Sequence, residues 1–270
     1  VFSNRGAKIV PVPTDEHGIE MEELLALCSA YKPTLIYTIP TFQNPTGVTL
    51  SLERRKQLLK IAEEHQFLIV EDDSWSEIYF DDTLPPPPIK SLDEKGVVIY
   101  LKGFSKYFSP GCRIGIIVSN EAIFPALFAA KSLTDLGSPI LTQSAAAAFL
   151  HSNRMGEHII KLRTALEVRR NQFLNLLQKH LPDTVQWTEP VGGLSVWVSL
   201  PKGSDTLELL QITSKKGVSF FPGSFCYGDK KTSRHLRISF SYIDTDDIEP
   251  AVITLCQCIT DYLQHAEQSS

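Results

Sequence analysis

Residues 51–73 read SLERRKQLLKIAEEHQFLIVEDD, and this stretch decides the fold class. Ser51 can cap a helix that runs to His65, because a serine side chain accepts a backbone N–H at a helix N-terminus. Phe67 to Val70 then forms a short apolar run without alternation, which is typical of a strand covered on both faces in a parallel sheet. A helix followed by such a strand predicts an α/β unit.

The same alternation of apolar runs and amphipathic helices extends in both directions from this stretch. Upstream, Ala7 to Pro11 and Thr34 to Thr38 are expected strands on either side of a helix near Met21 to Ala30. Downstream, Val97 to Leu101 and Ile114 to Val118 repeat the pattern of the covered strand. The sequence therefore predicts a mostly parallel sheet with helices packed on it.

A different pattern begins after Ser138 and predicts a second, smaller domain. Leu141 to Leu150 is an Ala-rich helix, and Met155 to His180 is a long basic amphipathic helix of the kind that joins two domains. We place the domains at residues 1–150 and 151–270. Four strands and a closing helix of an α+β unit are expected at Val185 to Trp187, Ser195 to Leu200, Val218 to Phe220, Leu236 to Phe240, and Asp246 to about Leu263.

The composition excludes several classes of protein. The formal charge of −5 arises from 31 acidic and 26 basic residues, without a run of like charges that would grip nucleic acid. No apolar stretch approaches the ~20 residues that cross a bilayer. The five cysteines form no CxxC pair and have no histidine at metal-ligand spacing. We therefore expect a reduced, cytoplasmic protein without a metal site.

Polar segments follow several predicted strands, at the edge where open α/β sheets bind ligands. The first is Pro40-Thr-Phe-Gln-Asn-Pro-Thr-Gly47, whose Asn-Pro pair could also form only a tight turn. The second is Glu71-Asp-Asp73, directly after a predicted buried strand. These acids could cap the next helix, or they could face a cationic ligand atom.

A third segment offers a nucleophile and an anion clamp. It comprises Gly103-Phe-Ser-Lys106 and Pro110-Gly-Cys-Arg113. A lone lysine would usually extend to water, but the glycine, serine and arginine that accompany Lys106 favour phosphate binding. The fourth feature is Arg237, on a predicted strand. This guanidinium could pair with any nearby acid, or it could hold a substrate carboxylate through two hydrogen bonds.

An Asn, an Asp, a Lys and an Arg in this order, each at a predicted strand, resemble the fold-type I aminotransferases of class I and II, which use pyridoxal 5′-phosphate (PLP). The resemblance implies a three-layer α/β domain with a mostly parallel sheet, incomplete at its N-terminus, and a smaller α+β domain. Lys106 would form the aldimine with the cofactor aldehyde in a dry cleft, where burial favours the neutral amine. Asp72, rather than Asp73, would pair with the pyridine nitrogen.

The remaining site residues follow from the same resemblance. Asn44 would donate to the phenolic oxygen of PLP, and the peptide bond between Asn44 and Pro45 would be cis. Ser105 and Arg113 would hold the phosphate. Arg237 would receive the α-carboxylate of an amino acid.

Two positions depart from the pattern of most aminotransferases. Trp75 stands where a tyrosine usually reaches the phenolic oxygen, and an indole provides one donor and no proton to exchange. Gly103 stands where a phosphate-binding Ser or Thr is usual. The stretches Tyr100-Leu-Lys-Gly-Phe-Ser-Lys106 and Gly192-Gly-Leu-Ser-Val-Trp-Val-Ser-Leu-Pro201 resemble the C-terminal domains of MocR-type regulators in the GntR superfamily.

The resemblance also implies two upstream features, a Gly-rich phosphate-binding turn and an aromatic ring that stacks on the cofactor. Neither occurs among the 43 residues before Asn44. We therefore expect the chain to be truncated at its N-terminus. A winged-helix DNA-binding domain, if the parent protein has one, would lie further upstream.

Three functions remain open at this point. The first is an effector-sensing and dimerisation domain of a MocR-type transcription regulator, which binds PLP and responds to an amino compound. The second is a free-standing aminotransferase, of 2-aminoadipate or broad specificity, in which Lys106 carries the proton. The third is a remnant that keeps the fold but neither cofactor nor activity. The resemblance implies a homodimer and an amino acid or amine as ligand, with DNA contacted only through an upstream domain and no membrane partner.

Overall fold

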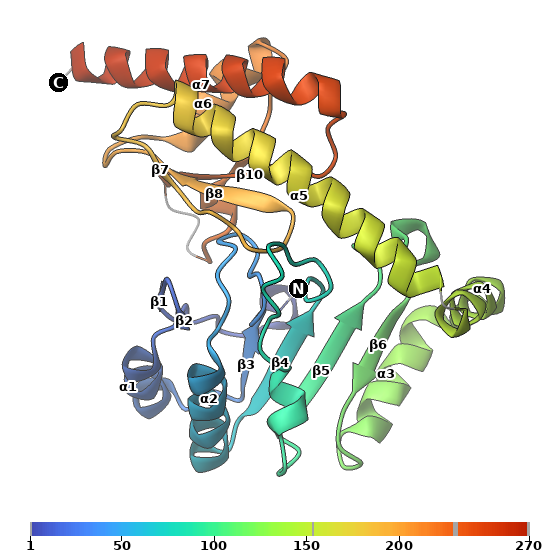
Figure 1. Cartoon of the computed structure of the whole chain (residues 1–270). Helices are drawn as coiled ribbons and strands as arrows, with labels where there is room; N and C mark the ends of the chain where they lie inside the picture. The colour runs from blue at the N-terminus through green and yellow to red at the C-terminus, as the bar shows by residue number, and fades with distance from the viewer. Residues whose placement is uncertain (1, 153, 229–231, 269–270) are drawn as a thin grey trace. The chain divides into compact units, whose positions relative to one another are not determined.

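The computed structural model describes residues 2–152, 154–228 and 232–268, and Figure 1 shows its helices and strands. Contacts divide the chain into two units. The parallel-sheet unit comprises residues 12–43 and 48–163, and the antiparallel-sheet unit comprises residues 1–11, 44–47 and 164–270. That the functional domains of the protein meet at residue 150 stays a prediction.

The parallel-sheet unit is built on four strands in the order β3-β4-β5-β6. β3 (Leu35–Thr38), β4 (Leu68–Asp73) and β5 (Val98–Gly103) run parallel, whereas β6 (Gly115–Val118) pairs antiparallel with β5. The α/β class with a mostly parallel sheet is therefore confirmed. The direction of β6 corrects the expectation that it repeats the other strands, because apolar composition does not specify the direction of a strand.

Helices α1 (Met21–Tyr31) and α2 (Leu52–His65) supply the apolar side chains that cover the sheet core. The Ser51 side chain accepts the backbone N–H of Arg54 at 3.3 Å, so the predicted cap of α2 is confirmed. Leu58 of α2 and Ile69 of β4 are completely buried in the same cluster. Burial of this apolar surface is the main force that holds the helices on the sheet.

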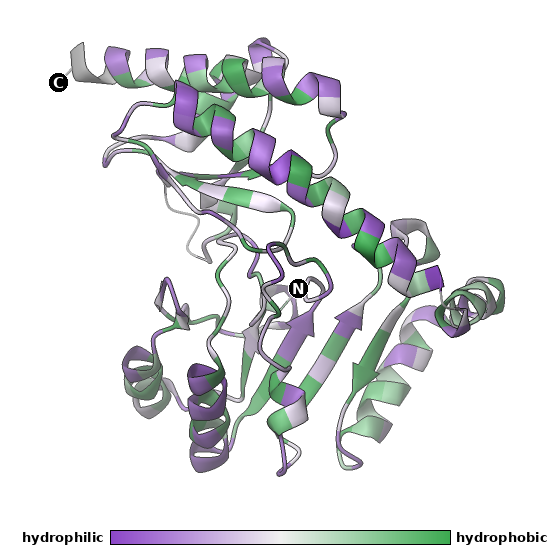
Figure 2. Cartoon of the chain, in the orientation of Figure 1, coloured by the Kyte–Doolittle hydropathy of each residue, from purple (hydrophilic) through white to green (hydrophobic). Residues whose placement is uncertain are grey.

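The two faces of the sheet are buried to different depths, most clearly in β3 and β6. Ile36 and Ile69 are at most 9% exposed, whereas Leu35 and Tyr37, which alternate with Ile36 along β3, are 38% and 42% exposed. All four residues of β6 are exposed, although Figure 2 shows this strand as hydrophobic. The expectation that the apolar strands are covered on both faces is therefore wrong for β6. In β5, the consecutive residues Val98 and Ile99 are both buried, and the second face of β4 is half-buried. An unbroken apolar run does not reveal whether a second layer packs against it.

The first residues of the chain differ from the prediction. Ala7 to Pro11 forms no strand. Prolines at positions 11 and 13 lack the N–H groups that a sheet ladder needs. Instead, β1 (Thr14–Asp15) and β2 (Gly18–Ile19) form a short antiparallel hairpin before α1.

Three further helices follow β6, namely α3 (Phe124–Asp135), α4 (Ile140–His151) and α5 (Arg154–His180). The last two confirm the helices predicted near Leu141 to Leu150 and Met155 to His180. Short 3₁₀ turns complete the element order at Ser3–Arg5 (η1), Ile89–Leu92 (η2), Pro110–Cys112 (η3) and Gly223–Phe225 (η4). Within the described residues, none of the helices combines the length and the apolar character that a membrane span requires.

The antiparallel-sheet unit has the strand order β7-β8-β10-β9. Its strands are β7 (Gln186–Trp187), β8 (Ser195–Ser199), β9 (Phe221–Pro222) and β10 (His235–Ser239), and its further helices are α6 (Thr206–Lys215) and α7 (Thr245–Gln268). Leu236 and Ile238 of β10 are buried, whereas His235, Arg237 and Ser239 alternate with them on the other face. The predicted α+β arrangement is confirmed, although the strand expected at residues 218–220 lies instead at Phe221–Pro222.

Candidate functional site

Two consecutive carboxylates end β4, and the structure gives them different environments. Asp73 is only 4% exposed and accepts hydrogen bonds from Tyr100 Oη at 2.5 Å, Ser76 Oγ at 2.8 Å and Lys102 Nζ at 3.0 Å. Burial alone would raise the pKa of Asp73, but the charge of Lys102 and the hydrogen bonds outweigh it and hold this pKa below its usual value. Asp73 is thus committed to an internal ion pair.

Asp72 is half-buried and receives two hydroxyl groups instead of a cation. Tyr37 Oη donates to Asp72 Oδ2 at 2.6 Å, and Ser74 Oγ donates to Asp72 Oδ1 at 2.7 Å. Burial raises the pKa of Tyr37, and the neighbouring carboxylate raises it further, so the phenol stays protonated as a donor. Asp72 has no ion pair within the described ranges, which leaves its charge available to a cationic N–H group.

Tyr37 is a site residue that the sequence did not single out. It lies on β3 beside Val70 of β4, and Asp72 is two residues further along β4 on the same face. Diagonal neighbours of this kind are within reach of a long aromatic side chain. The register of β3 against β4 carries this information, and the register becomes known only once the strands are paired.

Lys106 lies in the turn after β5, and its side chain is exposed. The expectation of a dry cleft around its nitrogen is therefore wrong for the chain as described. Phe104 and Tyr107 take the buried positions of this turn, at 7% and 4% exposed, and this turns the lysine outward. Its ammonium lies 5.3 Å from the centre of the Trp75 ring, a cation–π contact that keeps the amine on the side of Trp75.

The two residues assigned to the phosphate have no side-chain partner among the described residues. Ser105 is half-buried, and Arg113 is exposed with a left-handed backbone (φ 52°) at the end of η3. A hydroxyl and a guanidinium without internal partners suit an anion. Gly103 provides no third group, and a Cβ atom built at this position would lie 3.2 Å from Ser74 Oγ.

Asn44 and Arg237 meet in the antiparallel-sheet unit. Arg237 Nη1 donates to Asn44 Oδ1 at 2.6 Å, and the guanidinium lies 4.7 Å from the centre of the Phe221 ring. The peptide bond between Asn44 and Pro45 is cis, as the resemblance implies. Arg237 has no carboxylate partner among the described residues, so its charge is available for a ligand carboxylate. The structure thus groups Asn44 with Arg237, and it places Asp72, Trp75 and Lys106 in the parallel-sheet unit.

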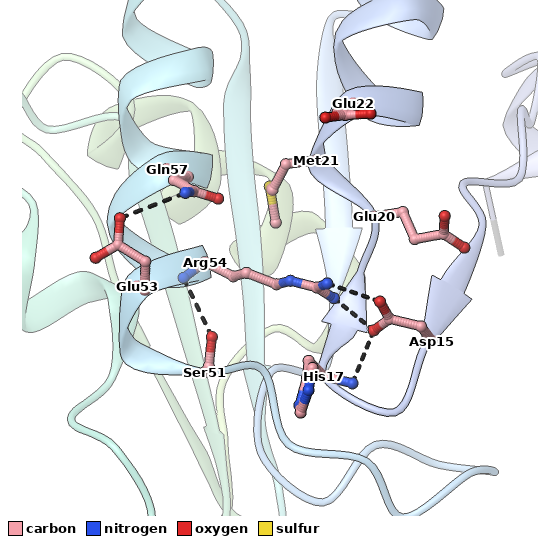
Figure 3. Close-up of a pocket in the computed structure, with 9 residues that line it drawn as sticks. All are labelled: Asp15, His17, Glu20, Met21, Glu22, Ser51, Glu53, Arg54 and Gln57. Atoms are coloured by element: carbon pink, nitrogen blue, oxygen red, sulfur yellow. Dashed lines mark hydrogen bonds and ion pairs between the residues drawn. The ribbon is translucent and has the colours of Figure 1, made fainter.

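A cavity of about 610 Å³ opens elsewhere in the parallel-sheet unit, and Figure 3 shows the side chains around it. Its lining includes Asp15, Glu20, Glu22 and Glu53, but none of the predicted site residues. Arg54 donates through both terminal nitrogens to Asp15, at 2.5 and 2.7 Å, and this pairing lowers the pKa of Asp15 to about 2. The one guanidinium at this cavity is therefore already neutralised. No cluster of His, Cys, Asp and Glu in the described ranges is arranged to hold a metal ion.

Comparisons with known proteins show what the whole chain is similar to. Aromatic-amino-acid aminotransferase 1 of Thermococcus litoralis is 36% identical over 262 residues, covering 95% of this chain and 63% of that enzyme. The uncharacterized HTH-type transcriptional regulator YisV of Bacillus subtilis is 33% identical over 252 residues, covering 93% of this chain and 51% of that protein. The crystal structure of Pyrococcus horikoshii kynurenine aminotransferase in complex with PMP superimposes with a TM-score of 0.89 at 36% identity, covering 93% of this chain and 63% of that one.

The chain thus spans between 51% and 63% of the length of these three proteins. Enzymes and regulators match it at similar identity, so the comparisons do not separate the two. A family model described as aminotransferase class I and II matches residues 1–255. Together with the fold, this match shows that the chain belongs to the aminotransferase class I and II family.

Proposed function

We propose that the chain binds PLP through Lys106 and serves as the effector-sensing domain of a MocR-type transcription regulator. Members of its family use PLP. The observation that carries the proposal is the different use of the two carboxylates of β4. Asp73 forms an ion pair with Lys102. Asp72 accepts hydrogen bonds from two hydroxyls but has no ion pair among the described residues, and it lies beside the turn that contains Lys106.

Each remaining residue has a role that its surroundings support. When bound, PLP supplies an electron-accepting ring, and the protein orients that ring and tunes it. The Asp72 carboxylate would stabilise the proton on the pyridine nitrogen. Ser105 and Arg113, whose side chains have no partner in the part of the chain that the structure describes, would hold the phosphate. Asn44 would bind the phenolic oxygen, and Arg237 would bind the carboxylate of an amino acid.

Two substitutions favour a sensor over an enzyme. Trp75 offers an indole N–H and no exchangeable hydroxyl proton, so it can hold a ligand but cannot relay a proton as a tyrosine does. Gly103 removes a hydroxyl from the phosphate clamp. The first change weakens turnover more than it weakens binding, whereas the second removes a contact with the phosphate. DNA contact would then belong to a part of the parent protein outside this chain.

The alternative is a free-standing aminotransferase for 2-aminoadipate or a broad range of amino acids. Arg237 favours it, because a guanidinium without an internal carboxylate partner is suited to an amino acid substrate. A fast half-reaction with several amino acids, seen as loss of the cofactor's visible absorbance, would support the enzyme and contradict the sensor. Binding of amino acids without such turnover supports the sensor.

Reductive trapping tests the shared part of both functions. The chain is incubated with PLP, treated with borohydride and digested with a protease. The masses of the peptides are then measured by mass spectrometry. We expect the mass of the reduced cofactor on Lys106 and its absence in Lys106→Ala. Lys102 is the internal control, because its ammonium is held by Asp73, Ser76 and Glu77. A chain that traps no cofactor would instead be a remnant of the fold.

We further propose that the chain forms a homodimer through the face that carries α3 and α4. Leu133, Leu136, Ile140 and Leu141 lie on or between these helices and are 79% to 93% exposed. Large apolar side chains gathered in this way usually mark an interaction surface. Light scattering after size-exclusion chromatography should give the mass of two chains, and a monomer at all concentrations would contradict the proposal.

A further inference from the structure

Asp72 accepts two hydrogen bonds that none of the predicted roles explains. Both of its carboxylate oxygens are occupied by hydroxyl donors from different parts of the unit, Tyr37 on β3 and Ser74 after β4. We propose that Tyr37 and Ser74 are positioning residues that hold Asp72 for the pyridine nitrogen of PLP, and that glycine at position 103 is needed to make room for Ser74. The inference rests on the proposed function.

The first of the two hydrogen bonds comes from Tyr37 on β3. The parallel register puts Tyr37 beside Val70, so its ring reaches diagonally toward the end of β4. The phenol is held as a donor because burial and the nearby negative charge both disfavour its ionised form. A phenylalanine would fill the same space without the hydroxyl. Tyr37→Phe therefore removes the hydrogen bond to Asp72 Oδ2 and keeps the aromatic ring.

The second hydrogen bond comes from Ser74, whose side chain lies against Gly103. The distance of 3.2 Å between a Cβ atom at position 103 and Ser74 Oγ is tighter than an ordinary contact. A Cβ atom at position 103 would therefore push Ser74 Oγ away from its position beside Asp72. Glycine at position 103 thus provides no hydroxyl for the phosphate, but it leaves space for the Ser74 hydroxyl that donates to Asp72.

Two donors on two oxygens fix the plane of a carboxylate, because rotation about its last bond would break both hydrogen bonds. Each oxygen keeps a second lone pair that can accept the N–H of a pyridinium ring. A group that is already oriented loses less entropy when the ligand binds. The two hydrogen bonds should therefore strengthen only the contact of Asp72 with the ring nitrogen, and they should leave the phosphate contacts unchanged.

The test compares PLP with 1-deazapyridoxal 5′-phosphate, which has carbon in place of the ring nitrogen. Affinities of both are measured by absorbance titration for the wild type, Tyr37→Phe and Ser74→Ala. We expect each variant to bind PLP about 3- to 10-fold more weakly, the effect of one lost hydrogen bond, and to bind the deaza compound within about 2-fold of the wild type.

Tyr100→Phe and Ser76→Ala are matched controls, because they remove the same two kinds of hydroxyl from Asp73 rather than from Asp72. Both controls should stay within about 2-fold for both compounds, since one lost hydrogen bond here does not touch the ring site. Equal losses for PLP and the deaza compound in Tyr37→Phe or Ser74→Ala would overturn the inference, because they would indicate general damage to the fold. Unchanged PLP affinity would overturn it as well.

Gly103→Ala supplies an independent check, because it adds the Cβ atom that crowds Ser74 and brings no hydroxyl for the phosphate. It should weaken PLP binding by as much as Ser74→Ala does, and combining the two changes should cost no more than either alone, because both act through one hydrogen bond. Additive losses would overturn the role of Gly103. A wild type that binds neither compound would refute the proposed function itself. A wild type that binds PLP, with Tyr37→Phe and Ser74→Ala that bind it equally well, would refute only this inference.

Discussion

The two carboxylates at the end of β4 should respond in opposite ways to the same small change. Asp73→Asn removes the charge from a group that is 4% exposed and bound by Lys102, Tyr100 and Ser76. Asp72→Asn removes the charge from a half-buried group whose partners among the described residues are two hydroxyls. The first change should destabilise the fold, and the second should abolish cofactor binding while the fold persists.

The magnitudes follow from the partners. Removing one member of a buried ion pair costs about 3 to 5 kcal/mol, because the other charge is left unpaired. Lys102 keeps Glu77 Oε1 at 3.1 Å and Ser76 Oγ at 2.7 Å, so the lower end, about 3 kcal/mol, applies to Asp73→Asn. An asparagine at position 72 still offers one oxygen to the two hydroxyls, so the loss there is about 1 kcal/mol or less.

Urea unfolding of the cofactor-free chain, followed by circular dichroism, measures both values. A loss of 3 kcal/mol lowers the midpoint by about 1 M at a typical slope. Asp73→Asn should show this shift, and Asp72→Asn should show a third of it or less. Two equal shifts, or a larger one for Asp72→Asn, would refute the assignment of the two carboxylates to different tasks.

Other parts of the chain give further tests. Arg55 is fully buried and donates to four carbonyl groups and one hydroxyl, so Arg55→Met should lower the free energy of unfolding by about 3 kcal/mol or more in a denaturant titration, because several buried acceptors lose their donor. The ion pair of Asp15 and Arg54 should give a coupling energy of about 0.5 to 1 kcal/mol in a double-mutant cycle at pH 7. Since the pKa of Asp15 falls from 3.8 to about 2 on folding, this coupling should be complete above pH 4 and should disappear as the pH falls through 2; a coupling that persists in acid would contradict the pairing. Gly223→Ala should lower the melting temperature by the equivalent of about 1 to 3 kcal/mol, because its Cβ atom would lie 2.6 Å from the carbonyl oxygen of His235, and an unchanged melting curve would show that the backbone gives way there.

The sequence predicted those elements whose signals are local. The Ser51 cap and the apolar run before Glu71 define α2 and β4, because capping and burial each depend on a few neighbouring residues. The direction of β6 and the hairpin of Thr14 to Ile19 were missed. Strand direction and two-residue strands depend on partners distant in the chain, which composition does not name.

The candidate site shows the same limit. Asp72 and Arg237 could be chosen from motifs, but the choice of Asp72 over Asp73 gains its physical reason only from the contacts of Lys102. Tyr37 could not be found, because its part depends on the register of two strands. The exposure of Lys106 was predicted wrongly, since the motif does not determine which neighbours occupy the buried positions of its turn.

A crystal structure of the chain grown with PLP tests the central claim most directly. We predict continuous electron density between Lys106 Nζ and the aldehyde carbon of the cofactor, with an Asp72 oxygen within about 3 Å of the ring nitrogen, the length of a charged hydrogen bond. Cofactor bound to another lysine, or a ring nitrogen that faces solvent rather than Asp72, would contradict the account.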